Sequence, residues 1–265
     1  MAKDMRALKG RIRGVQGALK ITHAMKLVST AKLARARPRA DSIRRFAREV
    51  QAAVGYLGQI PPGQVKGRVV VAFGTDRGLV GALNTSVVRQ IAQYEHESPV
   101  IAVGQKLGAF MPGYGLRVVR TIKGLGDAPG MDAVRDIVEA LTGSIRLLPE
   151  ELVFIYPLMR SALEFEVVRE VVIPARFGPA PDVIFVPSYK AVIDEASQLH
   201  VASRILLALA ESRVIEFTQR IRAMDNASRK AEDLLDELSI LYNRARRERI
   251  TREMAEVIGG AEALG

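Results

Sequence analysis

Hydrophobic positions in the last quarter of the chain follow the period of a long helix. No glycine or proline interrupts the 71 residues from Ser188 to Ile258, and Gly259-Gly260 follows them. A run of this kind predicts a helix that ends at the glycines. Within it, steps of three or four separate the apolar or small residues Phe217, Ile221, Met224, Ala227, Ala231, Leu234, Leu238, Leu241 and Ala245. This heptad pattern predicts an apolar seam that packs against a second helix.

The start of the chain carries the same spacing and is predicted to supply that second helix. Its seam runs through Met5, Leu8, Ile12, Val15 and Leu19 and continues, after a shift in phase, at Ile21, Ala24, Val28 and Ala31. The two ends are therefore predicted to pair as an antiparallel coiled coil that projects from the body of the protein. Pro38 is expected to kink or interrupt the first helix, because proline removes a backbone hydrogen bond and clashes with the preceding turn.

The middle of the chain alternates short strand-like runs with helical patterns. Strands are predicted at 68–73, 100–103, 117–122, 151–156, 163–173 and 183–186, and helices at 85–97, 105–110 and 132–147. Such alternation is typical of an α/β layer domain. Prolines near positions 61 and 187 mark its limits, which predicts a coiled-coil shaft of residues 1–58 and 188–265 around an α/β domain of residues 59–187.

The segment FGTDRGLVGALNT, from Phe73 to Thr85, places a glycine-rich turn between a strand and a helix. A phosphate-binding loop needs GxxxxGK followed by Ser or Thr, and a dinucleotide fold needs GxGxxG. The three glycines here are spaced by four and three, and no lysine follows them. The spacing predicts a structural turn in which Thr75 or Asp76 caps backbone amides and Arg77 pairs nearby.

Other signs of catalysis or cofactor binding are missing from the sequence. It holds neither a GxSxG elbow nor an HExxH motif, and no set of serine, histidine and acid stands out. There is no cysteine, and His23, His96 and His200 are far apart, so neither a metal site nor any other cofactor is predicted. No apolar run reaches the roughly 18 residues that cross a bilayer, and the first residues do not resemble a signal peptide, so we expect a location inside the cell.

Positive charge is concentrated at the start of the chain. Of a net charge of +10, residues 1–58 hold 14 Lys or Arg against 3 Asp or Glu, whereas residues 59–194 hold 14 against 14 and residues 195–265 hold 11 against 12. One alternative is therefore a basic coiled-coil protein that binds nucleic acid, although Phe46 and Tyr56 are the only aromatic residues of the basic segment. A Rossmann-type enzyme is a second alternative.

Three segments together resemble one known family. They are KITHAMKLVSTAKLARAR at 20–37, TDRGLVGALN at 75–84 and MDNASRKAEDLLDELSILYNRARRERITREMAEVIGGAEAL at 224–264. In order and spacing they are similar to the gamma subunit of F-type ATP synthases, with weak matching over 104–181. The resemblance implies a Rossmann-like middle domain without a nucleotide, and hence a non-catalytic subunit of a proton-transporting complex. Pro38 and Arg252 depart from the family, which usually has a helix-compatible residue and a glutamine at these positions.

The resemblance also implies a mechanism and partners. Members of the family are the central rotor, which couples rotation of the c-ring to conformational cycling of three catalytic beta subunits. The implied partners are the alpha/beta hexamer, the epsilon subunit and the c-ring, with no nucleic acid, at the cytoplasmic face of the bacterial plasma membrane as a peripheral protein. The resemblance further implies that basic side chains meet an acidic loop of the beta subunits.

The candidate subunit-contact residues share either positive charge, a place in the turn or an apolar side chain on the shaft. They are Met25, Lys26, Lys32, Arg35, Arg37, Asp76, Arg77, Arg244, Arg246, Arg247, Arg252, Met254 and Ile258. Met25 serves either coupling or ordinary seam packing, and packing is favoured. The apolar tip that includes Met254 and Ile258 implies a receiving sleeve in a partner, because an exposed apolar tip favours aggregation.

Overall fold

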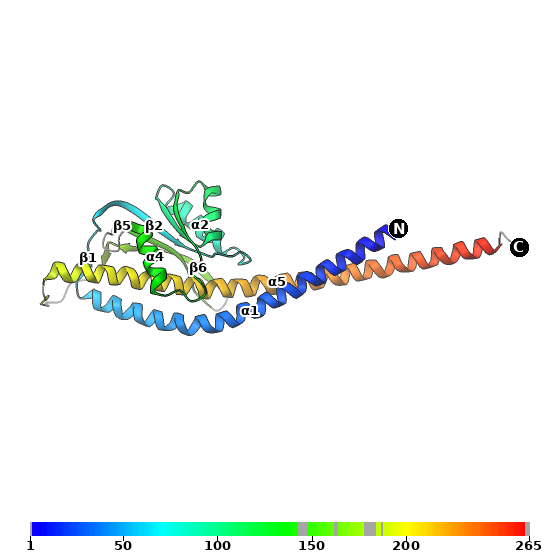
Figure 1. Cartoon of the computed structure of the whole chain (residues 1–265), viewed down its shortest axis with the longest axis horizontal. Coiled ribbons are helices and arrows are strands. Elements are labelled where there is room, and N and C mark those ends of the chain that lie inside the picture. The colour runs from blue at the N-terminus through cyan, green and yellow to red at the C-terminus, as the bar shows by residue number, and fades with distance from the viewer. Residues whose placement is uncertain (1, 143–147, 162–163, 178–183, 187, 263–265) are drawn as a thin grey trace. The chain divides into compact units, whose positions relative to one another are not determined.

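Two long helices form the ends of the protein. A computed structural model describes residues 2–142, 148–161, 164–177, 184–186 and 188–262. Helix α1 (Ala2–Gly55) and helix α5 (Tyr189–Glu262) contain 54 and 74 residues (Figure 1). Between them lie β1 (Gln59–Ile60), β2 (Val65–Phe73), α2 (Leu83–Tyr94), β3 (Val100–Val103), α3 (Gln105–Phe110), η1 (Met111–Tyr114), β4 (Val118–Ile122), α4 (Met131–Thr142), β5 (Pro149–Met159), β6 (Phe165–Ile173) and β7 (Ala175–Arg176).

The chain divides into two compact units, and the division cuts both long helices. Unit 1 comprises residues 1–28 and 221–265, and unit 2 comprises residues 29–220. The helical segments 29–55 and 189–220 thus pack with the sheet of unit 2. The division into a shaft of residues 1–58 and 188–265 and a middle domain of residues 59–187 stays a prediction.

A five-stranded sheet organises unit 2, and the predicted α/β fold is confirmed. Its strand order is β4-β3-β2-β5-β6, in which the first four strands are parallel to their neighbours and β6 runs antiparallel to β5. The continuous apolar run from Val69 to Phe73 suits a central parallel strand, because helices cover both faces of such a sheet. A separate antiparallel pair joins β1 to β7.

Helices cover the sheet on both faces and produce three layers. On one face, Val70 and Ala72 of β2 pack with α2 and α3. On the other face, Val71 and Phe73 pack with α4 and with the segments of α1 and α5 that belong to unit 2. Figure 1 shows α2 and α5 on opposite sides of the strands. Strand alternation therefore sends neighbouring residues of β2 into two separate cores.

In unit 1 the helices α1 and α5 pair in antiparallel directions, as predicted. Thr22 Oγ1 lies 2.8 Å from Ser228 Oγ, and Lys26 Nζ lies 2.5 Å from Asp225 Oδ1. Residue numbers thus rise along one helix as they fall along the other. The first stretch of the predicted seam on α1, from Met5 to Leu19, is half-buried at each of its five positions.

The phase shift predicted after Leu19 is wrong. The inward positions of α1 continue without a break at Thr22, Lys26 and Ser29, although these residues are polar. Ile21 and Val28, which the shifted seam contained, are exposed. An undisturbed helix keeps its heptad phase whatever residues occupy it, and polar side chains enter the seam where they find partners across it, as Thr22 does in Ser228.

The same error affects the seam of α5 after Met224. Its inward positions are Ser228, Ala231, Leu235, Leu238, Tyr242 and Ala245, of which Ala231, Leu238 and Ala245 had been predicted. Leu241 is 51% exposed, whereas Leu238 is only 6% exposed. Where leucines stand side by side at 234 and 235, hydrophobicity alone does not identify the inward one, and Leu235 is the more buried of the two.

Of the two effects predicted for Pro38, a kink or an interruption of α1, the interruption is wrong. The helix is continuous through Pro38, whose carbonyl accepts a hydrogen bond from Ser42 Oγ at 3.1 Å. Proline removes the hydrogen bond that the Ala34 carbonyl would otherwise accept. Both Pro38 and Ala34 are exposed, so water can reach that carbonyl and the helix tolerates the loss.

Replacing Pro38 by alanine should stabilise the isolated chain. Proline within a helix costs about 3 kcal/mol relative to alanine, and its restriction of the unfolded chain offsets up to roughly 1 kcal/mol of this. We therefore expect Pro38→Ala to raise the free energy of unfolding by about 2 kcal/mol in a urea titration. Ala34→Gly serves as the control in the same turn and should lower the free energy of unfolding. An unchanged free energy of unfolding in Pro38→Ala would show that the proline does not strain the helix.

Three further boundaries differ from the predictions. Helix α5 passes through Gly259-Gly260 to Glu262 instead of ending there, because glycine weakens a helix without being incompatible with its geometry. Residues 184–186 form no strand, and Ile184 and Val186 are exposed. An extended apolar segment is not stabilised where no neighbouring strand hydrogen-bonds to it. Positions 143–147, 163 and 183 of the predicted elements lie outside the described residues.

The described helices include none whose apolar stretch is long enough to span a membrane.

Candidate functional site

The glycine-rich turn after β2 is closed by its own side chains. Asn84 Oδ1 accepts a hydrogen bond from the Thr75 backbone N–H at 3.2 Å, and Asn84 Nδ2 donates to Thr75 Oγ1 at 2.8 Å. Thr75 Oγ1 in turn donates to the Arg77 carbonyl at 2.7 Å. Thr75 and Asn84 are both buried. The polar groups of the turn thus hydrogen-bond to one another, which supports the structural interpretation of its glycines.

Two glycines allow neighbouring loops to approach this turn. A Cβ at Gly104, where φ is +121°, would lie 2.8 Å from the backbone of Thr75, and a Cβ at Gly74 would lie 2.7 Å from Leu107 Cβ. Asp76 joins the loops further, because its carboxylate accepts the backbone N–H of Gln105 at 2.9 Å and of Gly124 at 3.0 Å. Asp76 therefore caps backbone amides as predicted, while Arg77 makes no ion pair within the described part of the chain.

Gly104→Ala should destabilise unit 2 through this close approach. The added methyl meets backbone atoms that cannot rotate away, in a conformation that L-residues avoid, so we expect a loss of about 2 kcal/mol or more in the free energy of unfolding. Gly81→Ala is the matched control: its φ is also positive, at +59°, but nothing lies near the added Cβ. Chemical denaturation of both variants would contradict the argument if they lost equal stability.

A buried cluster of ion pairs on α5 lies next to the turn after β2. Glu216 accepts hydrogen bonds from Arg213 at 2.5 Å and from Arg220 at 2.8 Å, and all three side chains are at most 10% exposed. Arg220 also donates to the carbonyl of Gly78, within the turn, at 3.3 Å. Of the predicted contact residues, Lys32 pairs with Asp127 at 2.8 Å and lies 5.9 Å from the ring centroid of Phe217.

The predicted contact residues of unit 1 lie beside the seam. Met25 and Lys26 are half-buried, and the ammonium group of Lys26 hydrogen-bonds to Asp225, which lowers the pKa of that carboxylate. Asp225 also accepts a hydrogen bond from Arg229 at 2.8 Å. Lys26 is therefore engaged within the helix pair.

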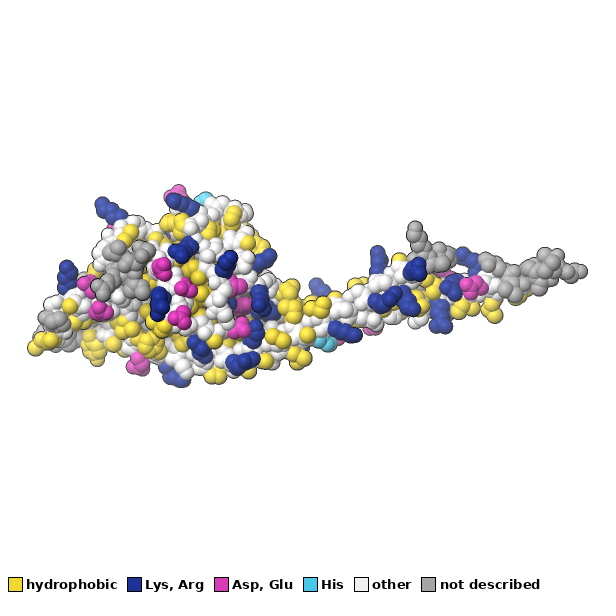
Figure 2. Space-filling model, in the orientation of Figure 1, with side chains coloured by type: hydrophobic (Ala, Val, Ile, Leu, Met, Phe, Trp, Pro, Cys, Tyr) yellow, Lys and Arg dark blue, Asp and Glu magenta, His cyan; other side chains and the backbone are white. Residues whose placement is uncertain are grey.

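The remaining predicted cations are mostly exposed, and the structure does not bring them together. Arg35 and Arg37 lie on the exposed surface of α1 within unit 2. In unit 1, Arg244 pairs with Glu248 at 3.1 Å. Arg246, Arg247 and Arg252 are exposed, as are the apolar side chains of Met254 and Ile258. Figure 2 shows Lys and Arg side chains interspersed with hydrophobic ones on the surface of the helix pair.

Sequence reasoning missed an exposed apolar patch on unit 1. Ile21, Leu27 and Val28 of α1 are exposed, Leu27 to 71%, next to the polar inward residues Thr22 and Lys26. We call these three residues the α1 apolar patch. Its signal was present in the sequence, since Ile21 and Val28 are seven residues apart, but it was assigned to the seam instead of the surface.

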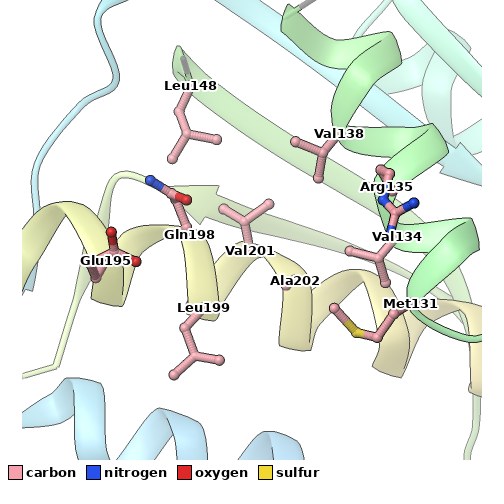
Figure 3. Close-up of a pocket in the computed structure, with 10 residues that line it drawn as sticks. All are labelled: Met131, Val134, Arg135, Val138, Leu148, Glu195, Gln198, Leu199, Val201 and Ala202. Atoms are coloured by element: carbon pink, nitrogen blue, oxygen red, sulfur yellow. The ribbon is translucent and has the colours of Figure 1, made fainter. Parts of the chain in front are cut away.

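An apolar pocket of about 390 Å³ lies between α4 and α5 (Figure 3). Val134 and Val138 of α4 face Val201 and Ala202 of α5 across it, and Leu148 closes one end. Arg135, Glu195 and Gln198 are its polar lining residues. Within the described residues, no group of three or more His, Asp or Glu side chains is placed to hold a metal ion.

Comparisons with known proteins assign nearly the whole chain to one family. The family model described as ATP synthase matches residues 4–264. The ATP synthase gamma chain of Chlorobium phaeobacteroides is 31% identical and covers 99% of this chain and 98% of its own length. The ATP synthase gamma chain of Moorella thermoacetica is 30% identical, with coverages of 98% and 99%.

Solved structures share the fold. A chain of the Euglena gracilis mitochondrial ATP synthase, in an assembly of OSCP, F1 and c-ring, matches all of this chain and 95% of its own length, with a TM-score of 0.78 and 20% identity. A chain of the Tetrahymena thermophila central stalk and c-ring matches 78% of this chain and 99% of its own, with a TM-score of 0.60 and 20% identity. Neither set of comparisons supports the nucleic-acid-binding alternative.

Proposed function

This chain belongs to the family of ATP synthase gamma chains, and we propose that it works as the rotating shaft of its complex without an active site of its own. The observation that carries this is the match over residues 4–264, joined to the antiparallel pairing of α1 and α5 in unit 1. In the complex the chain couples rotation of the c-ring to conformational cycling of the three catalytic beta subunits. Its partners are the alpha/beta hexamer, the epsilon subunit and the c-ring.

The helix pair of unit 1 suits the part of a shaft that turns inside a hexamer. Two helices of different sequence present different side chains in different directions, so three identical subunits around them meet three different surfaces. Each catalytic site is thereby biased towards a different conformation, and a third of a turn exchanges their affinities for nucleotide. ATP chemistry then belongs to the beta subunits.

The residues proposed to meet the hexamer lie on unit 1. The α1 apolar patch is exposed in the isolated chain. Burial of its apolar surface against a partner would stabilise the complex by about 25 cal/mol for each Å² removed from water. Arg246, Arg247 and Arg252 would meet acidic surfaces, each contact contributing about 0 to 1 kcal/mol because exposed ion pairs are screened. Met254 and Ile258 would enter an apolar sleeve of the hexamer.

Unit 2 is proposed to bind the lower partners, the epsilon subunit and the c-ring. Its sheet is a rigid platform covered by helices on both faces. The chain would reach the membrane only through these partners, as a peripheral protein at the cytoplasmic face of a bacterial plasma membrane.

Reconstitution with alpha and beta subunits tests the proposal. The isolated chain should show no ATPase activity, and its addition to the other two subunits should establish cooperative multisite hydrolysis. An unaltered hexamer rate would contradict the shaft function, and hydrolysis by the purified chain alone would contradict the absence of an active site. A thermal shift with ATP or NAD on the isolated chain would revive the alternative of a Rossmann-type enzyme.

The α1 apolar patch gives this experiment a residue-level control. Ile21→Ser with Val28→Ser changes only exposed positions, so the variant chain should fold normally while its apparent affinity for the hexamer falls about tenfold or more. Leu234→Ser, an exposed apolar position of α5, is the matched single-site comparison.

A further inference from the structure

A polar cavity of about 230 Å³ lies within unit 2, beside the turn after β2. It is at the carboxyl ends of the parallel strands β2 and β4, which is the edge where open α/β sheets bind their ligands. Its lining residues come from α1, from the segments that follow β2 and β4, and from α5; they are Lys32, Asp76, Arg77, Gly124, Gly126, Asp127, Arg213, Glu216 and Arg220. No part of the shaft function uses this cavity.

Cations outnumber carboxylates around the cavity. Four Lys or Arg side chains face three Asp or Glu side chains in its lining. Glu216 is the single carboxylate that hydrogen-bonds to both Arg213 and Arg220, so it neutralises only one of the two guanidinium charges. Asp76 is 4.0 Å from Arg213 and already accepts two backbone N–H groups. The lining therefore retains a net charge of +1.

Within the described residues, the guanidinium groups of Arg213 and Arg220 keep N–H donors without a protein acceptor. Each has five N–H groups, of which the bonds to Glu216 and to the Gly78 carbonyl use a minority. Yet none of the nitrogens of Arg213 or Arg220 is sealed away without a hydrogen bond, whereas Nε of Arg204 is. The nitrogens of these two side chains that make no hydrogen bond therefore keep some exposed surface, and both side chains line the cavity.

We propose that this cavity binds a small oxyanion with the size and charge of inorganic phosphate. Guanidinium groups match phosphate oxygens in geometry, and a dianion offers several acceptors to donors that converge from different elements. The volume is below the roughly 300 to 1,000 Å³ of ordinary ligand pockets, which suits a free anion and not a whole nucleotide. Arg77, which is exposed and has no ion pair within the described residues, is the cation most available to the anion.

Calorimetric titration of the full chain with inorganic phosphate tests this proposal. The titration starts in a phosphate-free buffer, with sodium chloride adjusted to keep ionic strength constant, because diffuse attraction to a basic protein is screened by salt. We expect saturable binding of one phosphate per chain and a rise in the midpoint of thermal unfolding that saturates with it. An acetate arm identifies the source of the oxyanion: binding of acetate as tight as that of phosphate would overturn phosphate as the ligand and indicate a carboxylate site.

Two exposed or half-exposed cations of the lining supply variants that should fold. Arg77→Gln and Lys32→Gln should each weaken phosphate binding about tenfold, the effect of losing one charge-assisted contact. Arg35→Gln is the charge-matched control, since Arg35 is an exposed cation of α1 outside the lining, and its affinity should equal that of the unmodified chain. Absence of saturation at tens of millimolar phosphate, or equal affinity in Arg77→Gln and Arg35→Gln, would overturn the proposal. Neither result bears on the reconstitution with alpha and beta subunits.

Discussion

Glu216→Gln is expected to lower the free energy of unfolding of unit 2 by about 3 to 5 kcal/mol, the usual cost of removing one partner from a buried ion pair. The physical reason is that Arg213 and Arg220, which are only 10% and 8% exposed, then share no carboxylate between them. Their mutual repulsion acts at low effective dielectric, where it is stronger than in water. Glutamine keeps the shape of the side chain, so the loss measures charge and not packing.

The measurement is a urea titration followed by the circular dichroism of the helices. Glu237→Gln is the matched control on the same helix, because Glu237 is exposed, and its effect should stay within about 0.5 kcal/mol. A double change of Glu216→Gln with Arg213→Gln should recover part of the stability, since it removes one of the two stranded charges. Equal stability of Glu216→Gln and the unmodified chain would mean that water already solvates both arginines or that bound anions already neutralise them.

The α/β fold was predictable because the hydrophobic pattern and the local propensities agree in the sheet. The apolar run of β2 is buried on both faces, and every helix after β2, β3 and β4 was expected from its period. The segment 184–186 shows the limit of such reasoning. A strand is stabilised by its neighbours, and the sequence of a single apolar run does not say whether a neighbour is present.

The helix pair was predictable in kind but not in phase. The apolar pattern predicts Ile21 as a seam residue, yet Thr22 occupies the inward position and bonds to Ser228. In a protein that functions alone, exposed leucine, isoleucine and valine at this density would favour aggregation. Because apolar residues lie on the exposed face of α1 as well as in the seam, hydrophobicity marks two faces of one helix and does not identify the seam.

The candidate site was predictable only where its residues are close in sequence. The role of Asp76 as an amide cap followed from its place in the turn. Arg213, Glu216 and Arg220 are three and four residues apart, the spacing of ordinary ion pairs on an exposed helix face. Such exposed pairs contribute little to stability. Its burial depends on the turn after β2 and on the loop after β4, which lie more than eighty residues away in sequence, and no local pattern encodes that approach.

His200 is expected to make unit 2 less stable as the pH falls from neutral towards 4. Its side chain is buried on α5, with its ring edge-on to Phe177 at 5.6 Å, and Nδ1 has no hydrogen-bond partner. Burial, and then the positive charge of Arg204, lower the pKa of His200 to about 4, while Glu170 and the Val172 backbone act in the opposite direction.

The sign of the effect follows from proton binding. The unfolded chain has a histidine pKa of about 6.5 and takes up a proton before the folded chain does, so between the two values each unit of pH lost removes about 1.4 kcal/mol of stability. The contribution is fully present above pH 6.5 and falls by about 2 kcal/mol at pH 5, and by about 3 kcal/mol at pH 4. Below about pH 3, where both forms are protonated, it stops changing.

Comparison of variants separates His200 from the carboxylates that also titrate in this range. The free energy of unfolding is measured at pH 7 and pH 5 for the unmodified chain, for His200→Gln and for His96→Gln, whose native side chain is exposed. The difference between the two pH values should shrink by about 2 kcal/mol in His200→Gln and remain the same in His96→Gln. Glutamine will also change the absolute stability, but only the pH difference reports protonation. An equal pH difference in all three proteins would mean that local opening of unit 2 exposes His200 to water without global unfolding. The description of His200 as a buried, neutral ring would then be wrong.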